Sequence, residues 1–261
     1  MTQLVNVEIA DGIAIVTIDN PPMNVLSGQV TRELGEVFSR IADDSSVVVA
    51  ILTGAGNRAF MAGADIKEFP SSLGKEKAEL LKNNLESHRV LNFIADLPKP
   101  TIAVLNGLAL GGGCELALTC DIRIAEEQVK IGLPEVKLGL FPGGGGTQRL
   151  PRLIGPSKAK ELMFIGDPIS AQEALNLGLV NQVAASGEGI QAALKIARKI
   201  AGYSIQALSR IKRAVNEGFD TTFEKGIELE AELFADIFAT EDVREGVQAF
   251  IEKRPASFKH R

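Results

Sequence analysis

The sequence predicts an α/β protein in which a largely parallel sheet with helical crossovers is followed by a helical C-terminal region. Apolar β-branched segments alternate with helical patterns through the first 195 residues, and from Gly187 onward only helical patterns remain. The segment 47–53 (VVVAILT) is an apolar strand and 101–106 (TIAVLN) is another buried strand, which is typical of strands covered on both faces. We therefore expect a mixed α/β core over residues 1–195 and a helical region over residues 196–261.

The chain opens with a predicted β-hairpin. Residues 4–9 and 13–18 are β-branched runs, and Asp11-Gly12 between them is a strong turn signal. Asn20-Pro21-Pro22 ends the second strand. Ser27 is then suited to cap a helix, because apolar residues recur after it at helical spacing.

The middle of the chain continues the alternation of strand and helix. The strand 47–53 is followed by a glycine-broken loop over residues 54–65. Residues 75–97 predict a long amphipathic helix, which Pro98 and Pro100 end. The strand 101–106 then leads through glycines to a short apolar helix over residues 113–120.

The second half contains shorter elements. Two capping boxes mark helix starts, Ser170-x-x-Glu173 and Thr221-x-x-Glu224, the second before a helical run to Ala239. The predicted short strands are 122–125, 130–132 and 179–183, and the predicted helices between them are 147–154, 157–165 and 170–177.

Composition excludes several classes of protein. The 261 residues carry a net charge of −5, with 45% hydrophobic and 23% charged residues, unlike a disordered tail, a collagen-like fibre or a supercharged nucleic-acid clamp. No apolar run approaches the ~20 residues that span a bilayer, and the acidic start with Glu8 and Asp11 is unlike a signal or transit peptide. We expect a cytoplasmic protein that binds neither membranes nor nucleic acids.

Cysteine and histidine are sparse. Cys114 and Cys120 lie in one apolar run, so we expect free thiols in a reducing compartment and no disulfide framework. The two histidines, His88 and His260, stand far apart, and no cluster with metal-ligand spacing is present. We therefore expect no metal site, and we expect His88 to be a surface or packing residue.

Glycine is the unusual residue in this composition. The chain has 26 glycines, and ten of them fall within residues 107–146. A phosphate-binding P-loop would need GxxxxGK[ST], and no lysine follows these glycines at that spacing. The triplet Gly111–Gly113 follows a strand, but its register does not match the dinucleotide-binding pattern GxGxxG. Both phosphate-binding interpretations are therefore weak.

Geometry offers a better explanation for the triplet. A strand ending at Asn106, then glycines, then a helix would bring bare backbone N–H groups to a helix N-terminus. Such donors suit a negative charge that develops on a substrate oxygen, and the absence of side chains allows close approach. The alternative is that the glycines allow tight packing of helix against sheet, with Glu115 merely complementing the helix dipole.

Two carboxylates stand in apolar surroundings near these glycines. Glu115 lies within Cys-Glu-Leu-Ala-Leu-Thr-Cys, and Glu135 follows Leu133-Pro134 in another apolar stretch. A buried carboxylate is costly unless it is paired or protonated, so such residues are often functional. Two carboxylates beside an oxyanion site suggest acid–base chemistry next to a polarised carbonyl.

Four long segments carry a resemblance to a known family. They are residues 59–69 (AFMAGADIKEF), 106–125 (NGLALGGGCELALTCDIRIA), 132–155 (GLPEVKLGLFPGGGGTQRLPRLIG) and 169–183 (ISAQEALNLGLVNQV). Over essentially its whole length the chain resembles the enoyl-CoA hydratase (crotonase) family. The resemblance implies a spiral of ββα units with a helical C-terminal region that mediates assembly into homotrimers or hexamers.

The resemblance also implies roles for individual residues. The two catalytic glutamates of the hydratase subgroup match Glu115 and Glu135, and the oxyanion-hole N–H groups map to Ala64 and Gly112. Glu115 would activate the attacking water, and Glu135 would protonate C2 of the substrate. Substrate and CoA contacts map to Ala62, Gly63, Asp65, Ile66, Lys67, Gly111 and Lys259, with Arg58 as a further basic candidate.

The activity that follows from this resemblance is reversible addition of water to trans-2-enoyl-CoA, giving 3-hydroxyacyl-CoA, in fatty-acid β-oxidation or related short-chain acyl-CoA metabolism. No metal or redox cofactor is expected, since coenzyme A is part of the substrate. A Δ3-Δ2 enoyl-CoA isomerase is an alternative, although isomerases commonly lack a glutamate at the position of Glu115. A branched-chain (methylglutaconyl-type) hydratase and a non-catalytic RNA-binding homologue are further alternatives, the last disfavoured by the net charge and the single tyrosine.

Overall fold

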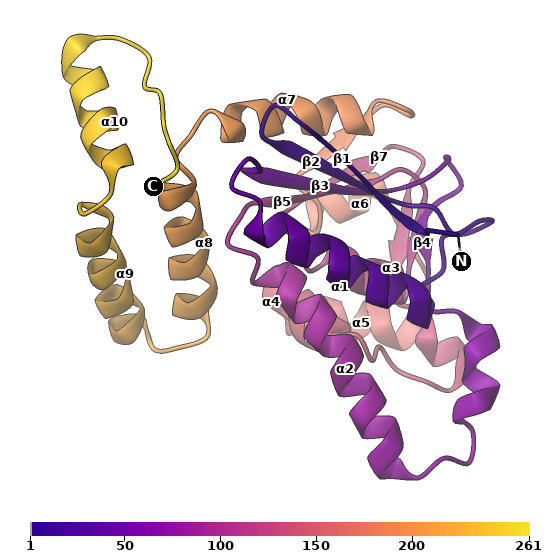
Figure 1. The fold of residues 1–261 in the computed structure, drawn as a ribbon. Coiled ribbons are helices and arrows are strands. Elements are labelled where there is room, and N and C mark those ends of the chain that lie inside the picture. The colour runs from indigo at the N-terminus through magenta and orange to yellow at the C-terminus, as the bar shows by residue number, and fades with distance from the viewer. Residues whose placement is uncertain (1) are drawn as a thin grey trace.

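The computed structural model describes residues 2–261 and contains a core built on two sheets, with three helices that stand off to one side (Figure 1). The larger sheet has the strand order β1-β2-β3-β5-β7-β10, and the smaller has the order β4-β6-β8-β9. Every strand pair in the larger sheet is parallel except the hairpin at its edge. The predicted fold class and the largely parallel sheet are therefore confirmed.

The larger sheet contains most of the strands that the sequence predicts. The expected hairpin is present as β1 (Val5–Ala10) and β2 (Ile13–Ile18), and β3 (Val49–Gly54), β5 (Thr101–Leu105) and β7 (Ile122–Glu126) follow in parallel. The prediction of a strand over residues 179–183 is wrong, because β10 is Gln182–Ala184. Leu179 and Val180 are apolar for another reason: their N–H groups donate to Ala174 O in a buried turn that closes a helix.

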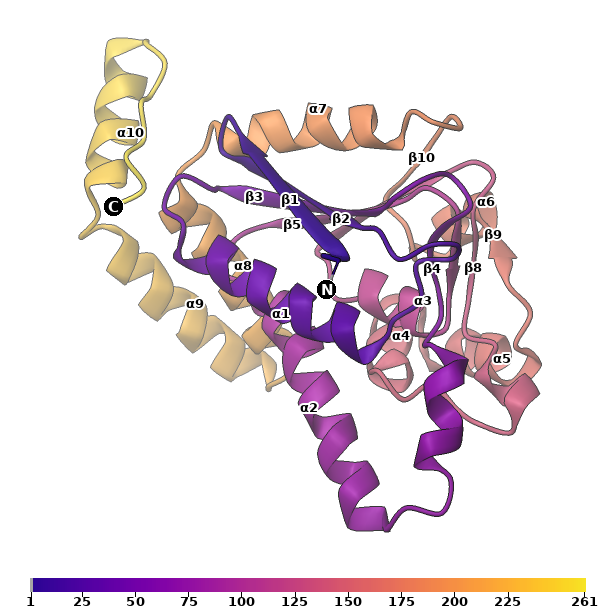
Figure 2. The same cartoon turned by 45° about the vertical axis from the view of Figure 1, so that its right-hand side comes forward.

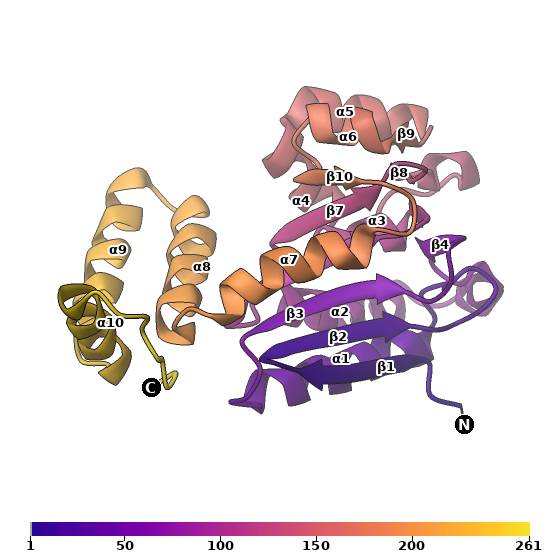
Figure 3. The same cartoon turned by 90° about the horizontal axis from the view of Figure 1, so that it is seen from above.

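The central strands are apolar throughout because each of their faces packs against a separate cluster. Ala50 and Leu52 of β3 belong to the main core, whereas Val49 and Ile51 face a smaller cluster. That smaller cluster lies under α7 (Gly189–Ala201), and α1 (Gly28–Asp43) covers the opposite face of the sheet (Figures 1 and 3). This sandwich explains why residues 47–53 lack the polar alternation of a half-exposed strand.

The smaller sheet was largely missed by sequence reasoning. It consists of β4 (Ala59–Ala62), β6 (Leu108–Leu110), β8 (Lys130–Gly132) and β9 (Ile169–Ser170), of which only β8 was predicted. The expected loop over residues 54–65 contains β4, and β6 stands between the strand at 101–105 and the glycine triplet. Strands of two to four residues are too short for a periodic pattern to develop.

The remaining core helices connect these strands. α2 (Lys77–Ala95) extends below the core and is reached through the 3-10 helix η1 (Ile66–Ser72), as Figure 2 shows. The short helix α3 (Gly112–Ala117) is buried throughout. After the second 3-10 helix, η2 (Glu135–Leu138), come α4 (Gly146–Ile154), α5 (Pro156–Ile165) and α6 (Ala171–Asn176).

Helix starts agree with the predicted caps in two cases out of three. The side chains of Ser27 and Ser170 accept from the N–H groups of Val30 and Glu173, as expected. The predicted box Thr221-x-x-Glu224 is one residue out of register: Thr222 is the extended residue that caps α9 (Phe223–Ile237) by accepting from Lys225 N. Adjacent threonines have equal capping capacity, so the sequence could not decide between them.

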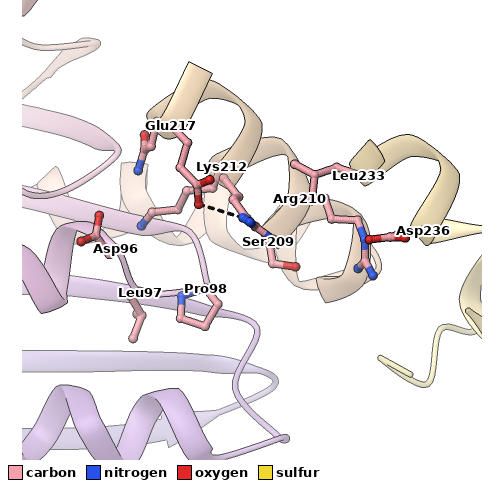
Figure 4. A pocket seen from close by; sticks show the side chains of 11 residues that line it. Asp96, Leu97, Pro98, Ser209, Arg210, Lys212, Glu217, Leu233 and Asp236 are labelled. Atoms are coloured by element: carbon pink, nitrogen blue, oxygen red, sulfur yellow. Dashed lines mark hydrogen bonds and ion pairs between the residues drawn. The ribbon is translucent and has the colours of Figure 1, made fainter. Parts of the chain in front are cut away.

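The three C-terminal helices, α8 (Ile205–Phe219), α9 and α10 (Glu241–Glu252), stand beside the core in every view (Figures 1–3). The predicted boundary at residues 195/196 falls inside α7, which contacts the larger sheet, so the division into two domains stays a prediction. A groove of about 540 Å³ separates α8 and α9 from the end of α2 (Figure 4). Near it, Lys212 Nζ of α8 bonds Asp121 Oδ2 of the core at 2.9 Å.

Within residues 2–261, no helix is long and apolar enough to cross a membrane.

Candidate active site

Two glycine-containing loops meet at one edge of the smaller sheet. β4 and β6 are parallel neighbours in which Ala62 pairs with Leu110, so the residues that follow each strand emerge side by side. Gly63 and Gly111 are those residues, and both have positive φ angles, 101° and 53°, a region that glycine enters without strain. The parallel pairing therefore brings residues 64 and 112 together although 48 positions separate them.

Two backbone N–H groups converge where these loops meet. A methyl group added to the Cα of Gly112 would lie 3.5 Å from the backbone nitrogen of Ala64. In the bridge that holds the first loop, Leu26 N donates to Gly63 O and Asp65 N donates to Leu26 O, whereas Ala64 N donates to no acceptor within residues 2–261. Gly112 is the first residue of α3, where N–H groups have no intrahelical acceptor.

Glu115 lies one turn farther along α3 and is 4% exposed. Its Oε1 accepts hydrogen bonds from Gly144 N at 2.7 Å and from Gly146 N at 2.8 Å. Burial raises the pKa of the Glu115 carboxyl above its usual value, while these two amides and the charges of His88 and Arg149 oppose the rise. Because N–H donors pair only with an acceptor, the two amides favour the ionised carboxylate.

Glu135 is the first residue of η2 and approaches the same glycine triplet. A methyl group on the Cα of Gly111 would lie 3.0 Å from Glu135 Oε1. Its Oε2 is buried and accepts no hydrogen bond from the described part of the chain. Burial, aided by repulsion from Glu115, raises the pKa of Glu135 to about 7. The Glu135 backbone amide opposes this rise, but burial prevails, and such a carboxyl is suited to hold a proton near neutrality.

The packing alternative left open by the sequence is supported at some of these glycines, and the role of the others toward a substrate oxygen stays a prediction. A methyl group on Gly113 would lie 2.0 Å from Met61 O, and one on Gly144 would lie 2.5 Å from Glu115 Oε2. Gly113 is therefore required for close packing of α3 on β4. Gly111 and Gly144 instead make room for the two carboxylates.

Gly113→Ala is expected to destabilise the fold by several kcal/mol, because the contacted atom is backbone and cannot rotate away. Urea unfolding of the variant against the wild type measures the loss. Gly56→Ala is a useful comparison, since it strains a positive φ of 74° without meeting any atom within 4 Å. Equal stability of Gly113→Ala and the wild type would contradict the tight packing.

The structure brings most of the other predicted contact residues to the same loop. Ala62 ends β4, Asp65 caps η1 by accepting from Lys67 N, and Ile66 and Lys67 lie on the exposed first turn of η1. Lys259 is not brought to this loop within one chain. It lies in the C-terminal tail, where its N–H donates to Asp242, on the far side of the core from η1 (Figures 1 and 2).

Sequence reasoning missed several groups that contact the site. No role toward Glu115 was predicted for Gly144 or Gly146, yet their amides bind this carboxylate. His88 is half-buried on α2, in agreement with a surface or packing residue, and a charge on it would lower the pKa of the Glu115 carboxyl. Arg149 was not singled out at all. In residues 2–261, no group of three or more His, Cys, Asp or Glu side chains is arranged to hold a metal ion.

Comparison with known proteins gives consistent matches over nearly the whole chain. Residues 8–261 match the family model described as "Enoyl-CoA hydratase/isomerase". A probable enoyl-CoA hydratase of Bacillus subtilis is 45% identical over 248 residues, 95% of each chain, and a short-chain-enoyl-CoA hydratase of Clostridium acetobutylicum is 43% identical over 251 residues, also 95% of each. The solved structure of an enoyl-CoA hydratase from Bacillus anthracis superposes with a TM-score of 0.93 at 39% identity, covering 99% of this chain and 100% of that one.

Proposed function

The chain belongs to the enoyl-CoA hydratase/isomerase family, and from this premise we propose that it adds water reversibly across the double bond of trans-2-enoyl-CoA to give 3-hydroxyacyl-CoA. The observation that carries the proposal is that two backbone amides and two carboxyl groups lie next to one another. The backbone amides of Ala64 and Gly112 lie close together, beside one carboxyl that accepts from two amides and another whose pKa is raised to about 7. A relative from Syntrophomonas wolfei, 42% identical over 247 residues, is named crotonyl-CoA hydratase.

The Ala64 and Gly112 amides would bind the thioester oxygen of the substrate. Their donation withdraws electron density through the conjugated system, which makes C3 electrophilic, and it stabilises the enolate oxygen that forms when water adds. Because Gly112 also begins a helix, its N–H lies at a positive end of backbone dipoles. Ala62, Gly63 and Gly111 would line the approach of the acyl group to these donors.

The two glutamates would then divide the acid–base work. Glu115, kept ionised by Gly144 N and Gly146 N, would orient the water and take its proton as the oxygen attacks C3. Glu135, protonated below its raised pKa, would give a proton to C2 of the enolate. The transferred protons balance the reaction, so the proposed chemistry needs no cofactor beyond the coenzyme A of the substrate.

An assay with crotonyl-CoA tests this proposal. The absorbance of the conjugated enoyl thioester is expected to fall on mixing and to reach an equilibrium that 3-hydroxybutyryl-CoA approaches from the other side. No absorbance change across C4 to C10 enoyl-CoA substrates would overturn the assignment. Substrates with the double bond at C3 test the isomerase alternative, and 3-methylglutaconyl-CoA tests the branched-chain alternative.

We further propose that α8–α10 form the contact between subunits of a homotrimer or a hexamer. These helices expose large apolar side chains, which on a lone chain would be unusually extensive: Phe219, Phe223, Phe234, Phe238, Phe250 and Ile251 are each more than half exposed. Sedimentation velocity at micromolar concentration is expected to give the mass of three or six chains. A monomer at that concentration would contradict the proposed assembly.

Assembly would also give Lys259 a role. Since its own chain keeps it apart from the Asp65–Lys67 loop, it would contact the CoA of a neighbouring subunit, while Lys67 would contact CoA from within that loop. Arg58, the further basic candidate, precedes β4 and lies beside Gly107, at the opposite end of the strand from Gly63. Two free, fully buried cysteines suit a reducing compartment, and we propose the cytoplasm.

A further inference from the structure

Arg149 connects the turn beside Glu115 to a helix on the other side of the site. It lies on the first turn of α4, and its Nη1 donates to Gly144 O at 3.2 Å. Its Nη2 donates to Asn92 Oδ1 of α2 at 2.7 Å. The planar guanidinium therefore bridges two acceptors that belong to separate elements, which a single-point charge cannot do in the same geometry.

The turn that Arg149 contacts is the one that binds Glu115. Gly144 and Gly146 both donate to Glu115 Oε1, and Gly145 between them has a φ angle of 104°. A methyl group on the Cα of Gly145 would lie 2.2 Å from Arg149 Nη1, so the guanidinium packs directly against the turn. Glu115 thus binds the amides of Gly144 and Gly146, and the Arg149 guanidinium bonds Gly144 O and packs against Gly145 of the same turn.

The charge of Arg149 also acts on Glu115. The charged groups that face the Glu115 carboxyl are His88 from α2, Arg149 from α4 and Glu135 from η2. His88 and Arg149 lower the pKa of Glu115 against the effect of its burial, and Glu135 repels it. Of these two residues, only Arg149 is also bonded to the turn whose amides bind the carboxylate.

We propose that Arg149 is a positioning residue for this reaction: it fixes the Gly144–Gly146 turn, and with it the orientation of Glu115, while keeping a positive charge beside that carboxylate. The proposal rests on the function proposed above. A role as a ligand for the CoA phosphates is disfavoured because Arg149 is half-buried and its two terminal nitrogens are already engaged by Gly144 and Asn92.

Three variants test the proposal by steady-state kinetics across pH. Arg149→Gln is expected to lower kcat roughly 10- to 100-fold, since misplacing a catalytic group by about 1 Å has effects of that size. Its KM is expected to stay within about threefold of the wild-type value, because Arg149 does not touch the substrate carbonyl. The rising limb of the pH profile should move to higher pH, since Glu115 loses a cation that favours its ionised form.

Arg149→Lys and Arg152→Gln separate charge from geometry. Arg149→Lys keeps the charge but cannot bridge both acceptors, so kcat should fall while the rising limb moves less than in Arg149→Gln. Arg152→Gln, one turn along α4, removes an exposed arginine that bonds Gln148 O and Asp220. It is expected to match the wild type. A wild-type kcat and rising limb in Arg149→Gln would overturn the proposal, as would a raised KM with unchanged kcat.

A crystal structure of Arg149→Gln supplies a readout that does not depend on activity. The turn is expected to shift so that Gly144 N or Gly146 N no longer donates to Glu115 Oε1. Retention of both hydrogen bonds with the turn in place would overturn the positioning role. A wild-type protein without hydratase activity would overturn the proposed function and leave this structural test standing.

Discussion

Glu115→Gln is expected to lower kcat for the hydration of crotonyl-CoA by about 10²- to 10⁴-fold, the usual contribution of a positioned acid or base. Glutamine keeps the shape of the side chain and an oxygen that can accept from Gly144 N and Gly146 N, so the fold should be preserved. It cannot take a proton from water. KM should change little, because the thioester oxygen and the CoA are bound elsewhere.

Glu126→Gln is a matched control for this variant. Glu126 is also 4% exposed, and it likewise accepts from a glycine amide, Gly189 N at 3.1 Å, but it lies on β7 away from the site. The same chemical change at a buried glutamate should leave kcat within a few-fold of the wild-type value. Equal losses in both variants would mean that the effect of Glu115→Gln is a general packing defect.

Glu135→Gln is expected to lower kcat by a similar factor and also to change the shape of the pH profile. In the wild type, the proton on Glu135 is lost as pH rises through about 7, so the hydration rate should fall there. Protonation of Glu115 should give the opposite limb, and the two apparent pKa values belong to the interacting pair. Glutamine does not titrate, so the falling limb should disappear in the variant.

The measurement is log kcat/KM for crotonyl-CoA between pH 5 and 10, with CoA affinity followed separately by competition. A falling limb that persists near pH 7 in Glu135→Gln would assign that titration to another group. A wild-type rate in the variant would remove Glu135 from the mechanism. Either result leaves Glu115→Gln as an independent test of the base.

The long buried strands could be predicted because the apolar residues of β3 and β5 alternate between packed clusters on the two faces of the sheet. β4 and β6 have no such pattern because they are short. They are recognised as strands only in the structure, where they pair with each other. Thr221 and Thr222 show the same limit on a smaller scale. A local pattern states what a residue can do, and the tertiary context selects among neighbours that can do it equally well.

The two carboxylates could be recognised as unusual because apolar neighbours surround them in the sequence. Their partners could not be recognised, because Glu115 is held by backbone amides 29 and 31 residues farther along the chain. Every residue except proline has a backbone N–H, so the amino-acid type does not indicate which of these groups binds a side chain. Arg149 escaped notice for a related reason, since surface and half-buried arginines are alike in sequence.

The donors at Ala64 and Gly112 have a consequence for genetics. Because each belongs to the main chain, exchanging the side chain at position 64 does not delete the donor, and only proline lacks the N–H altogether. Saturation mutagenesis of position 64 would therefore measure how large a side chain is tolerated next to Gly112. It would not reveal the contribution of the backbone N–H. Selection on the side chains at positions 64 and 112 would thus not act directly on the two proposed backbone donors. The donors would be maintained through the residues that shape the two turns.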